Sequence, residues 1–231
     1  MINIIKDFIS LFYPEVCTLC GEGLNRSECY VCMSCIFKLP KTNYHLTEEN
    51  ELYKELYNRI GQKAAAAWCF YAKGNNVQQL VHELKYERKW ELGVNFGKWY
   101  GAELKHSPAF ASAQIIVPVP IHPNKLKRRG YNQAAVFAEG ISKSLNIPVE
   151  TKAIVKVKET ETQTHKRKYE RWENVQDIFR VTKPQLLENT HVLLVDDVIT
   201  TGATIEACTQ ALLSVPVASV CIAAIGYTKK V

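Results

Sequence analysis

Two adjacent carboxylates, Asp196 and Asp197, end an apolar run and are followed at once by a turn rich in hydroxyl groups. Threonine hydroxyls and the unpaired N–H groups at the start of a helix donate hydrogen bonds to phosphate oxygens. Glycine lets the backbone approach such a ligand closely, and carboxylates accept hydrogen bonds from hydroxyls. The pattern predicts a sugar-phosphate site, although an acidic strand end that caps a helix would explain part of it. The turn consists of Thr200, Thr201, Gly202, Ala203 and Thr204.

A second group of chemically active residues is a cysteine cluster near the start of the sequence. Five of the eight cysteines lie between positions 17 and 35. Cys17 and Cys20 form one C-x-x-C pair, and the second pair is either Cys29 with Cys32 or Cys32 with Cys35. Two such pairs supply four thiolates to a tetrahedral zinc ion. The alternative is a cluster of reduced cysteines without metal. The other three, Cys69, Cys208 and Cys221, are expected to be core residues.

These residues need a framework that brings distant segments together, and the apolar pattern predicts one. Short β-rich runs alternate with segments that carry apolar residues at helical spacing, which is typical of a mostly parallel sheet covered by helices. Ligands of such α/β sheets bind beyond the carboxyl ends of the strands, where the acid pair is expected. The expected strands are 65–73, 115–120, 177–182, 192–197 and 217–227, and the expected helices are 77–104, 132–146 and 201–214.

Length and composition suit one domain with a small additional module. The chain has 231 residues, 47% of them hydrophobic, and a formal net charge of +6 that permits an anionic partner without requiring one. We expect an N-terminal helix and zinc module over 1–44, a helical connector over 45–66 and a ligand-binding domain over 67–231. No apolar run is long enough for membrane insertion. The first residues faintly resemble an export signal, but Lys6 and Asp7 interrupt their apolar run and no small-residue cleavage site follows. We therefore expect a cytoplasmic protein, in which disulfides are rare.

The segment VLLVDDVITTGAT, residues 192–204, closely resembles the phosphoribosyl diphosphate (PRPP) motif of type I phosphoribosyltransferases. The resemblance implies that Asp196 and Asp197 hold the ribose 2′ and 3′ hydroxyls. It also implies that the turn after them binds the 5′-phosphate, with Mg²⁺ on the pyrophosphate group.

Further motifs follow one another in the order of the ComF family, which is associated with competence and DNA uptake. These motifs are CTLCG, CMSC before LP, LKYERKWELG, VPVPIHPNKLKRRGYNQA and TQTHKRKYERWENVQDIFRV. The resemblance favours Cys32 and Cys35 as the second zinc pair. It implies a pyrophosphate-binding loop that includes Val119 and Pro120, and a mobile loop over 162–174. His122 follows the first of these loops and is either close to the ligand or, like most of the histidines, a surface or capping residue.

Three short segments are rich in lysine and arginine, and each of them is compatible with an ordinary solvated surface. In one functional interpretation, Arg128, Arg129 and Arg171 bind the departing pyrophosphate through their planar guanidinium groups. In the other, basic side chains and stacking aromatic rings bind single-stranded nucleic acid. The segments are Lys125 to Arg129; Lys166, Arg167, Lys168 and Arg171 with Tyr169 and Trp172; and Lys85, Arg88 and Lys89 with Tyr86 and Trp90.

We therefore expect a PRPP- and Mg²⁺-binding protein of the phosphoribosyltransferase type, with a structural zinc ion and a link to DNA uptake. The alternative is a non-catalytic factor that uses the same fold to bind single-stranded DNA or to sense PRPP. No residue pattern identifies an acceptor. Because the cysteine pairs precede the acid pair by most of the chain, we expect the two sites to be independent.

Overall fold

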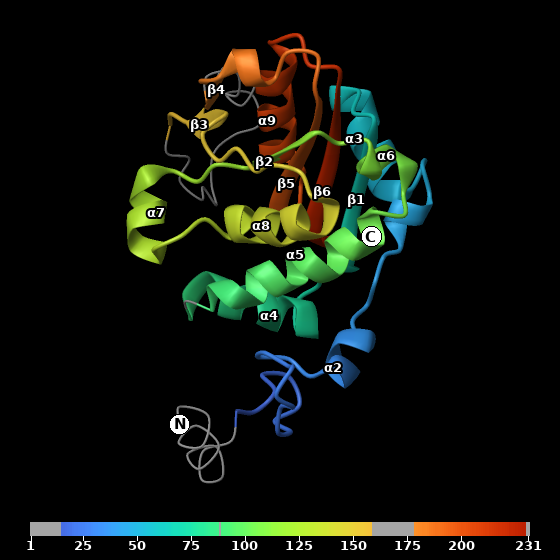
Figure 1. Cartoon of the computed structure of the whole chain (residues 1–231), viewed down its shortest axis with the longest axis vertical. Helices are drawn as coiled ribbons and strands as arrows, with labels where there is room; N and C mark the ends of the chain where they lie inside the picture. Colours follow the sequence, from blue (N-terminus) through green and yellow to red (C-terminus); the bar gives the residue numbers. More distant parts are fainter. Residues whose placement is uncertain (1–14, 88, 159–177, 230–231) are drawn as a thin grey trace.

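The computed structural model describes residues 15–87, 89–158 and 178–229. Its centre is a four-stranded sheet in which neighbouring strands run parallel, in the order β1-β6-β5-β2 (Figure 1). The strands are β1 (Ala64–Phe70), β2 (Ile115–Pro118), β5 (His191–Ile199) and β6 (Ser219–Tyr227). Of the two central strands, β6 is almost entirely apolar and β5 is apolar from Val192 to Val195, as expected for strands that are covered on both faces.

Helices cover both faces of the sheet and produce two hydrophobic cores, which confirms the predicted fold class. On one face lie α4 (Asn76–Tyr86), α5 (Trp90–Leu104) and α8 (Gln133–Leu145). On the other lie α3 (Glu51–Ile60) and α9 (Ala203–Leu213). Helices α5 and α8 cross at Gly97 and Gly140, where a Cβ atom on Gly140 would lie 2.1 Å from the carbonyl oxygen of Val94. A larger residue at this crossing would force the two helices apart.

The smaller elements include a second sheet. Strands β3 (Ile154–Lys156) and β4 (Phe179–Val181) pair antiparallel in a sheet of their own, so the predicted strand at 177–182 does not join the main sheet. Phe179 and Ile154 still pack into the core beneath α9. The remaining short helices are α2 (Met33–Phe37), η1 (Tyr44–Leu46), α6 (Pro108–Ala111), α7 (Pro123–Arg129) and η2 (Pro184–Leu186).

Two segments are organised differently from the sequence-based expectation. The helical pattern over 77–104 forms two helices, α4 and α5, rather than one. Within 45–66, helix α3 places Leu52, Leu56 and Ile60 in the core, and β1 already begins at Ala64. Apolar residues four positions apart share one face of a helix, so α3 packs onto the sheet. The division into three parts remains a prediction.

The N-terminal module lies below α4 and α5 in Figure 1. Its buried residues, among them Val31, Ile36 and Leu39, belong to the same hydrophobic core as the residues of these two helices. No helix in the described ranges has the length and apolar character required to cross a membrane. The helix expected at the N-terminus and the mobile loop expected over 162–174 lie outside the described residues.

Candidate functional site

Strand β5 carries the acid pair to the carboxyl edge of the sheet. Leu194 belongs to the core beneath α9, whereas Val195 belongs to the core beneath α4 and α5. Because side chains alternate along a strand, the side chain of Asp196 points to the face covered by α9 and that of Asp197 to the face covered by α4. Asp197 accordingly meets Lys85 of α4, whose Nζ atom lies 2.7 Å from Oδ2 of Asp197. The two adjacent carboxylates thus leave the strand toward opposite faces of the sheet.

The two half-buried carboxylates also influence each other. Burial, and then the negative charge of Asp197, raises the pKa of Asp196 well above its usual range. The N–H of Asp197 donates to Oδ1 of Asp196 at 2.8 Å, and the N–H of Val198 donates to Oδ1 of Asp197 at 2.7 Å. Since a carboxylate offers about four lone-pair positions, both side chains retain acceptor capacity for ligand hydroxyls.

The turn after β5 presents hydroxyl groups at the start of a helix. Thr200, Thr201 and Thr204 are exposed, and α9 begins at Ala203. Gly202 precedes the helix with a φ of 78°, a left-handed conformation that glycine adopts without steric cost. The N–H of Ala203 makes a long hydrogen bond, of 3.4 Å, to Oγ1 of Thr201. Three hydroxyls and the first N–H groups of α9 are therefore positioned for a phosphate group.

Helix α3 supports this turn and adds a cation that no sequence motif indicates. A Cβ atom on Gly202 would lie 2.8 Å from Cδ2 of Leu56 and 3.0 Å from Nη2 of Arg59, so α3 packs directly against the turn. Nη1 of Arg59 donates to the carbonyl oxygen of Thr201 at 3.3 Å and to Oε2 of Glu206 at 3.1 Å. Arg59 thus lies beside the expected phosphate position, where its charge is paired with Glu206 and with Glu55, whose Oε1 atom is 3.6 Å from Nη2.

The end of β2 lies beside the end of β5. The N–H of Val119 donates to the carbonyl oxygen of Val195 at 2.8 Å, and Nδ2 of Asn132 donates to the carbonyl oxygen of Val119 at 2.9 Å. Pro120 follows, and His122 then caps α7 by accepting a hydrogen bond from the N–H of Asn124 at 3.3 Å. The segment predicted to bind pyrophosphate therefore adjoins the strand that carries the acid pair.

Arg129 ends α7 and turns toward α4. Its Nη1 atom donates to Oε1 of Gln133 at 2.9 Å, and its guanidinium carbon lies 5.7 Å from the ring centre of Tyr86. Tyr86 follows Lys85, so Arg129 lies on the same side of the sheet as the Lys85–Asp197 pair. Nε of Arg129 is buried without a hydrogen-bond partner among the described residues. Arg171, the other arginine predicted to bind pyrophosphate, lies outside them.

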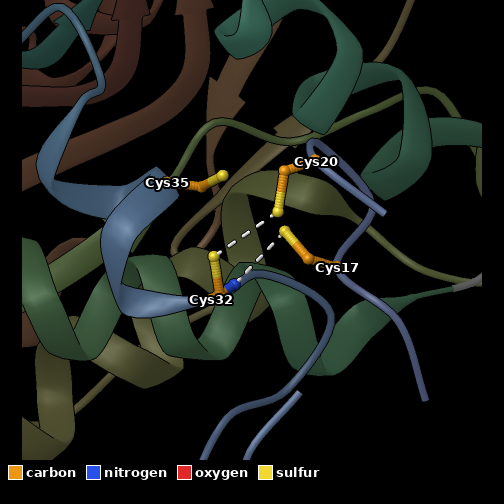
Figure 2. Close-up of side chains that lie close together, drawn as sticks. All are labelled: Cys17, Cys20, Cys32 and Cys35. Carbon is orange, nitrogen blue, oxygen red and sulfur yellow. Dashed lines mark hydrogen bonds between the residues drawn. The ribbon is translucent and has the colours of Figure 1, made fainter. Parts of the chain in front are cut away.

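The N-terminal module brings together four of the five clustered cysteines. Figure 2 shows their sulfur atoms converging, and all four lie within 4.8 Å of one another. The first pair lies in a tight turn that ends at Gly21, which has a φ of 75° and donates its N–H to the carbonyl oxygen of Cys17, and the second pair stands at the start of α2. Cys29 is not a member of the group. The four converging residues are Cys17, Cys20, Cys32 and Cys35.

The geometry of this cluster fits a tetrahedral metal site. With zinc–sulfur bonds of about 2.3 Å, the sulfurs of a tetrahedron lie about 3.8 Å apart. The Sγ atoms of Cys20 and Cys32 are 3.8 Å apart, and the N–H of Cys32 donates to Sγ of Cys17 at 3.4 Å. Burial opposes ionisation of Cys17, but hydrogen bonds, chiefly from backbone groups, outweigh it and lower its pKa to about 6. The donor set and its spacing suit zinc.

Direct contacts join the cysteine module to α4 and α5. Nε2 of Gln79 on α4 donates to the carbonyl oxygen of Thr18 at 2.8 Å. The hydroxyl of Tyr30 donates to Oε2 of Glu91 on α5 at 3.0 Å. The module therefore touches the helix that also carries Lys85.

Comparison with known proteins places this architecture in a family. The family described as "Phosphoribosyl transferase domain" matches residues 132–229, a range that contains the acid pair and the turn. Competence protein F of Haemophilus influenzae is 35% identical over 211 residues, which cover 87% of this chain and 92% of that protein. The chain belongs to the ComF family.

Other relatives span a similar part of the chain. Competence protein ComFC of Bacillus subtilis is 30% identical over 199 residues, covering 86% of this chain and 72% of that protein. DNA utilization protein YhgH of Escherichia coli K12 is 28% identical over 209 residues, covering 89% of this chain and 87% of that protein. The resemblance to the ComF family and to the phosphoribosyltransferase fold, predicted from the sequence, is confirmed.

Proposed function

We propose that this ComF-family protein binds PRPP with Mg²⁺ and acts as a phosphoribosyltransferase or a close relative, in a pathway linked to competence and DNA uptake. The observation that carries the proposal is the order of groups at the end of β5. Asp196 and Asp197 provide acceptors for hydroxyls, and three exposed threonines at the start of α9 provide donors for a phosphate. The matching domain family and the names of the relatives support it.

The reaction would break the bond between ribose C1 and pyrophosphate and form a bond between C1 and an acceptor nucleophile. The electron pair leaves with pyrophosphate, so positive charge develops on the sugar ring and negative charge on the departing group. In the proposed site, Asp196 and Asp197 orient the ribose, while the threonine turn anchors its 5′ end. Arg129 receives the pyrophosphate, and Val119 and Pro120 shape the loop that precedes it; Pro120 has no N–H, and that of Val119 already donates to Val195. When bound with PRPP, Mg²⁺ would offset the charge of the leaving group. No covalent nucleophile is required.

Binding and turnover are tested separately. Calorimetry with PRPP is expected to show binding in the presence of Mg²⁺ and much weaker binding in EDTA. Release of pyrophosphate is then measured with and without candidate acceptors. Release that depends on an acceptor would establish transfer, whereas binding without release under any condition would favour a PRPP sensor. Absence of PRPP binding in Mg²⁺ would contradict the proposal.

We also propose that the four clustered cysteines hold one structural zinc ion. Their converging sulfurs and the matching sulfur–sulfur distance support this assignment. A module of this size has little apolar surface to bury, so metal binding would supply part of its folding free energy. Such a site requires reduced thiols, which fits the cytoplasmic location that we propose.

Binding of single-stranded DNA is the second candidate function. It is favoured by the basic surface of α7, where Lys127 and Arg128 are exposed, and by the relatives named for DNA utilization and competence. Of the other two basic segments proposed for this role, the one with Lys85 and Lys89 has both lysines in ion pairs. The one with Lys166, Arg167, Lys168, Tyr169 and Trp172 lies outside the described residues.

This second function predicts a characteristic salt dependence. Replacing both Lys127 and Arg128 with alanine is expected to weaken single-strand binding and to reduce the slope of log K against log salt by about 1.4, because about 0.7 counterions are released per neutralised phosphate. The matched control is Lys54→Ala with Lys105→Ala, which removes two exposed charges elsewhere. Gel-shift titrations provide the measurement. If the native protein binds no single strand at low salt, this second function is wrong.

A further inference from the structure

Helix α4, which carries Lys85, is fixed by hydrogen bonds at both of its ends. At the start of α4, Oδ1 of Asn75 accepts a hydrogen bond from the N–H of Gln78 at 2.9 Å, and Nδ2 of Asn75 donates to the carbonyl oxygen of Phe70 at 2.9 Å. At the other end, the hydroxyl of Tyr131 donates to the carbonyl oxygen of Leu84. Since Leu84 itself is fully buried, the backbone that precedes Lys85 is firmly anchored.

The ammonium group of Lys85 meets the acid pair in a partly enclosed position. Nζ lies 2.7 Å from Oδ2 of Asp197, and the two side chains are only 22% and 16% exposed. Lys85 also lines a cavity of about 530 Å³, together with residues such as His82 and Tyr86. Neither Asp196 nor Asp197 lines this cavity, so Lys85 stands between the cavity on the α4 side and the acid pair at the end of β5.

Charge explains why a cation is needed at this point. Two adjacent carboxylates in half-buried positions repel each other, and each loses hydration. PRPP brings further negative charge to the same edge of the sheet. A cation that contacts one oxygen of Asp197 reduces this repulsion and fixes the plane of the carboxylate. Oδ1 is already oriented by the N–H of Val198 at 2.7 Å, so both oxygens have defined directions.

We propose that Lys85 is a positioning residue of the sugar-binding acid pair: it compensates the charge of Asp197 and orients its carboxylate toward the vicinal hydroxyls of a ribose phosphate. The inference rests on the proposed binding of PRPP and deepens it. It adds to the site a residue from α4, outside the matched domain family, which begins at residue 132. In this proposal Lys85 is therefore part of the site and not simply one charge of a solvated basic surface.

Three variants test this assignment. Lys85→Met removes the charge at similar length, and Lys85→Arg retains the charge. Lys89→Met is the matched control, because Lys89 forms a similar ion pair with Glu83, at 2.6 Å and with comparable exposure, at the same end of α4. PRPP affinity is measured by calorimetry in Mg²⁺, and thermal unfolding is followed in parallel.

We expect Lys85→Met to weaken PRPP binding by about tenfold or more, the loss typical of a charge-assisted contact. Lys85→Arg should recover most of the affinity, and Lys89→Met should leave it unchanged. In an Asp197→Asn background, Lys85→Met should have little further effect, because the two residues act as a unit. A general loss of stability would instead weaken binding equally in both backgrounds, and arginine would not selectively restore it.

Two other outcomes would overturn the inference for distinct reasons. If the native protein binds PRPP and Lys85→Met binds it equally or more tightly, Lys85 does not position Asp197 for the sugar. If the native protein fails to bind PRPP at all, the proposed function is wrong, and the role of Lys85 is wrong with it.

Discussion

Replacing Asp196 and Asp197 together with asparagine is expected to abolish measurable PRPP binding while the fold stays intact. Each carboxylate would lose charge-assisted hydrogen bonds to a sugar hydroxyl, worth about 1.5–3 kcal/mol, or about tenfold to 150-fold in affinity. Asparagine keeps the shape and one acceptor oxygen but lacks the charge. Calorimetry in Mg²⁺ measures the affinity. Undiminished binding by the double variant would refute the assignment of the ribose site.

Stability measurements separate this interpretation from a purely structural one. Burial, and then the charge of Asp197, raises the pKa of Asp196 in the folded state. A group with a raised folded pKa contributes stability below its unfolded pKa, near 3.9, and loses that contribution as the pH rises toward its folded pKa. At neutral pH Asp196 therefore contributes less to stability than it does at low pH. Asp196→Asn should then unfold at the same temperature as the native protein or at a higher one.

A structural role predicts the reverse pattern. If the acid pair served mainly to end β5 and cap α9, the asparagine variants would lower the unfolding temperature. PRPP affinity would then fall only as far as the loss of folded protein explains. The matched control is Glu150→Gln, which removes the carboxylate of a comparable ion pair, with Lys183 at 2.8 Å, beside the β3–β4 sheet. That variant should change stability slightly and leave PRPP affinity unchanged.

The sequence predicts the central parts of this candidate site because they lie next to one another along the chain. Asp196, the threonine turn and α9 follow one another along the chain, so an apolar run, a pair of carboxylates and a helical pattern suffice to place them at the edge of a parallel sheet. Spacing alone does not identify the four cysteines of the zinc site. Their spacing left the second pair open, and the resemblance to the ComF family favoured the residues that the structure brings together.

Residues supplied by distant helices were not predicted as part of the site. The sequence marks Lys85 only as one member of a basic segment, and no motif includes Arg59. Their positions depend on how α4 and α3 pack against the sheet, which neither charge nor spacing reveals. Strand β4 illustrates the same limit: its local pattern indicated a strand correctly, but not that it would pair with β3 outside the main sheet.

The zinc assignment predicts different outcomes for two cysteines that lie close together in the chain. Cys35→Ser should lower the zinc content well below one ion per chain, because three remaining thiolates leave the tetrahedron open. Cys29→Ser should leave the content near one, since Cys29 lies outside the four-sulfur group. Zinc is measured by elemental analysis of protein purified without chelator. The opposite result would assign the second pair to Cys29 and Cys32, and native protein without zinc would indicate a cluster of reduced cysteines.

The same pair of variants tests whether the two sites are independent. Separation along the chain suggested independence, but the buried cysteines Cys17, Cys32 and Cys35 share one hydrophobic core with α4, and Gln79 of α4 donates to Thr18 in the module. Loosening the module should therefore disturb the helix that holds Lys85 against Asp197. We expect Cys35→Ser to weaken PRPP binding by a small factor in addition to its loss of zinc, whereas Cys29→Ser should leave the affinity unchanged. Equal PRPP affinity in the zinc-depleted and native proteins would restore the simpler view, in which the module folds beside the site without supporting it.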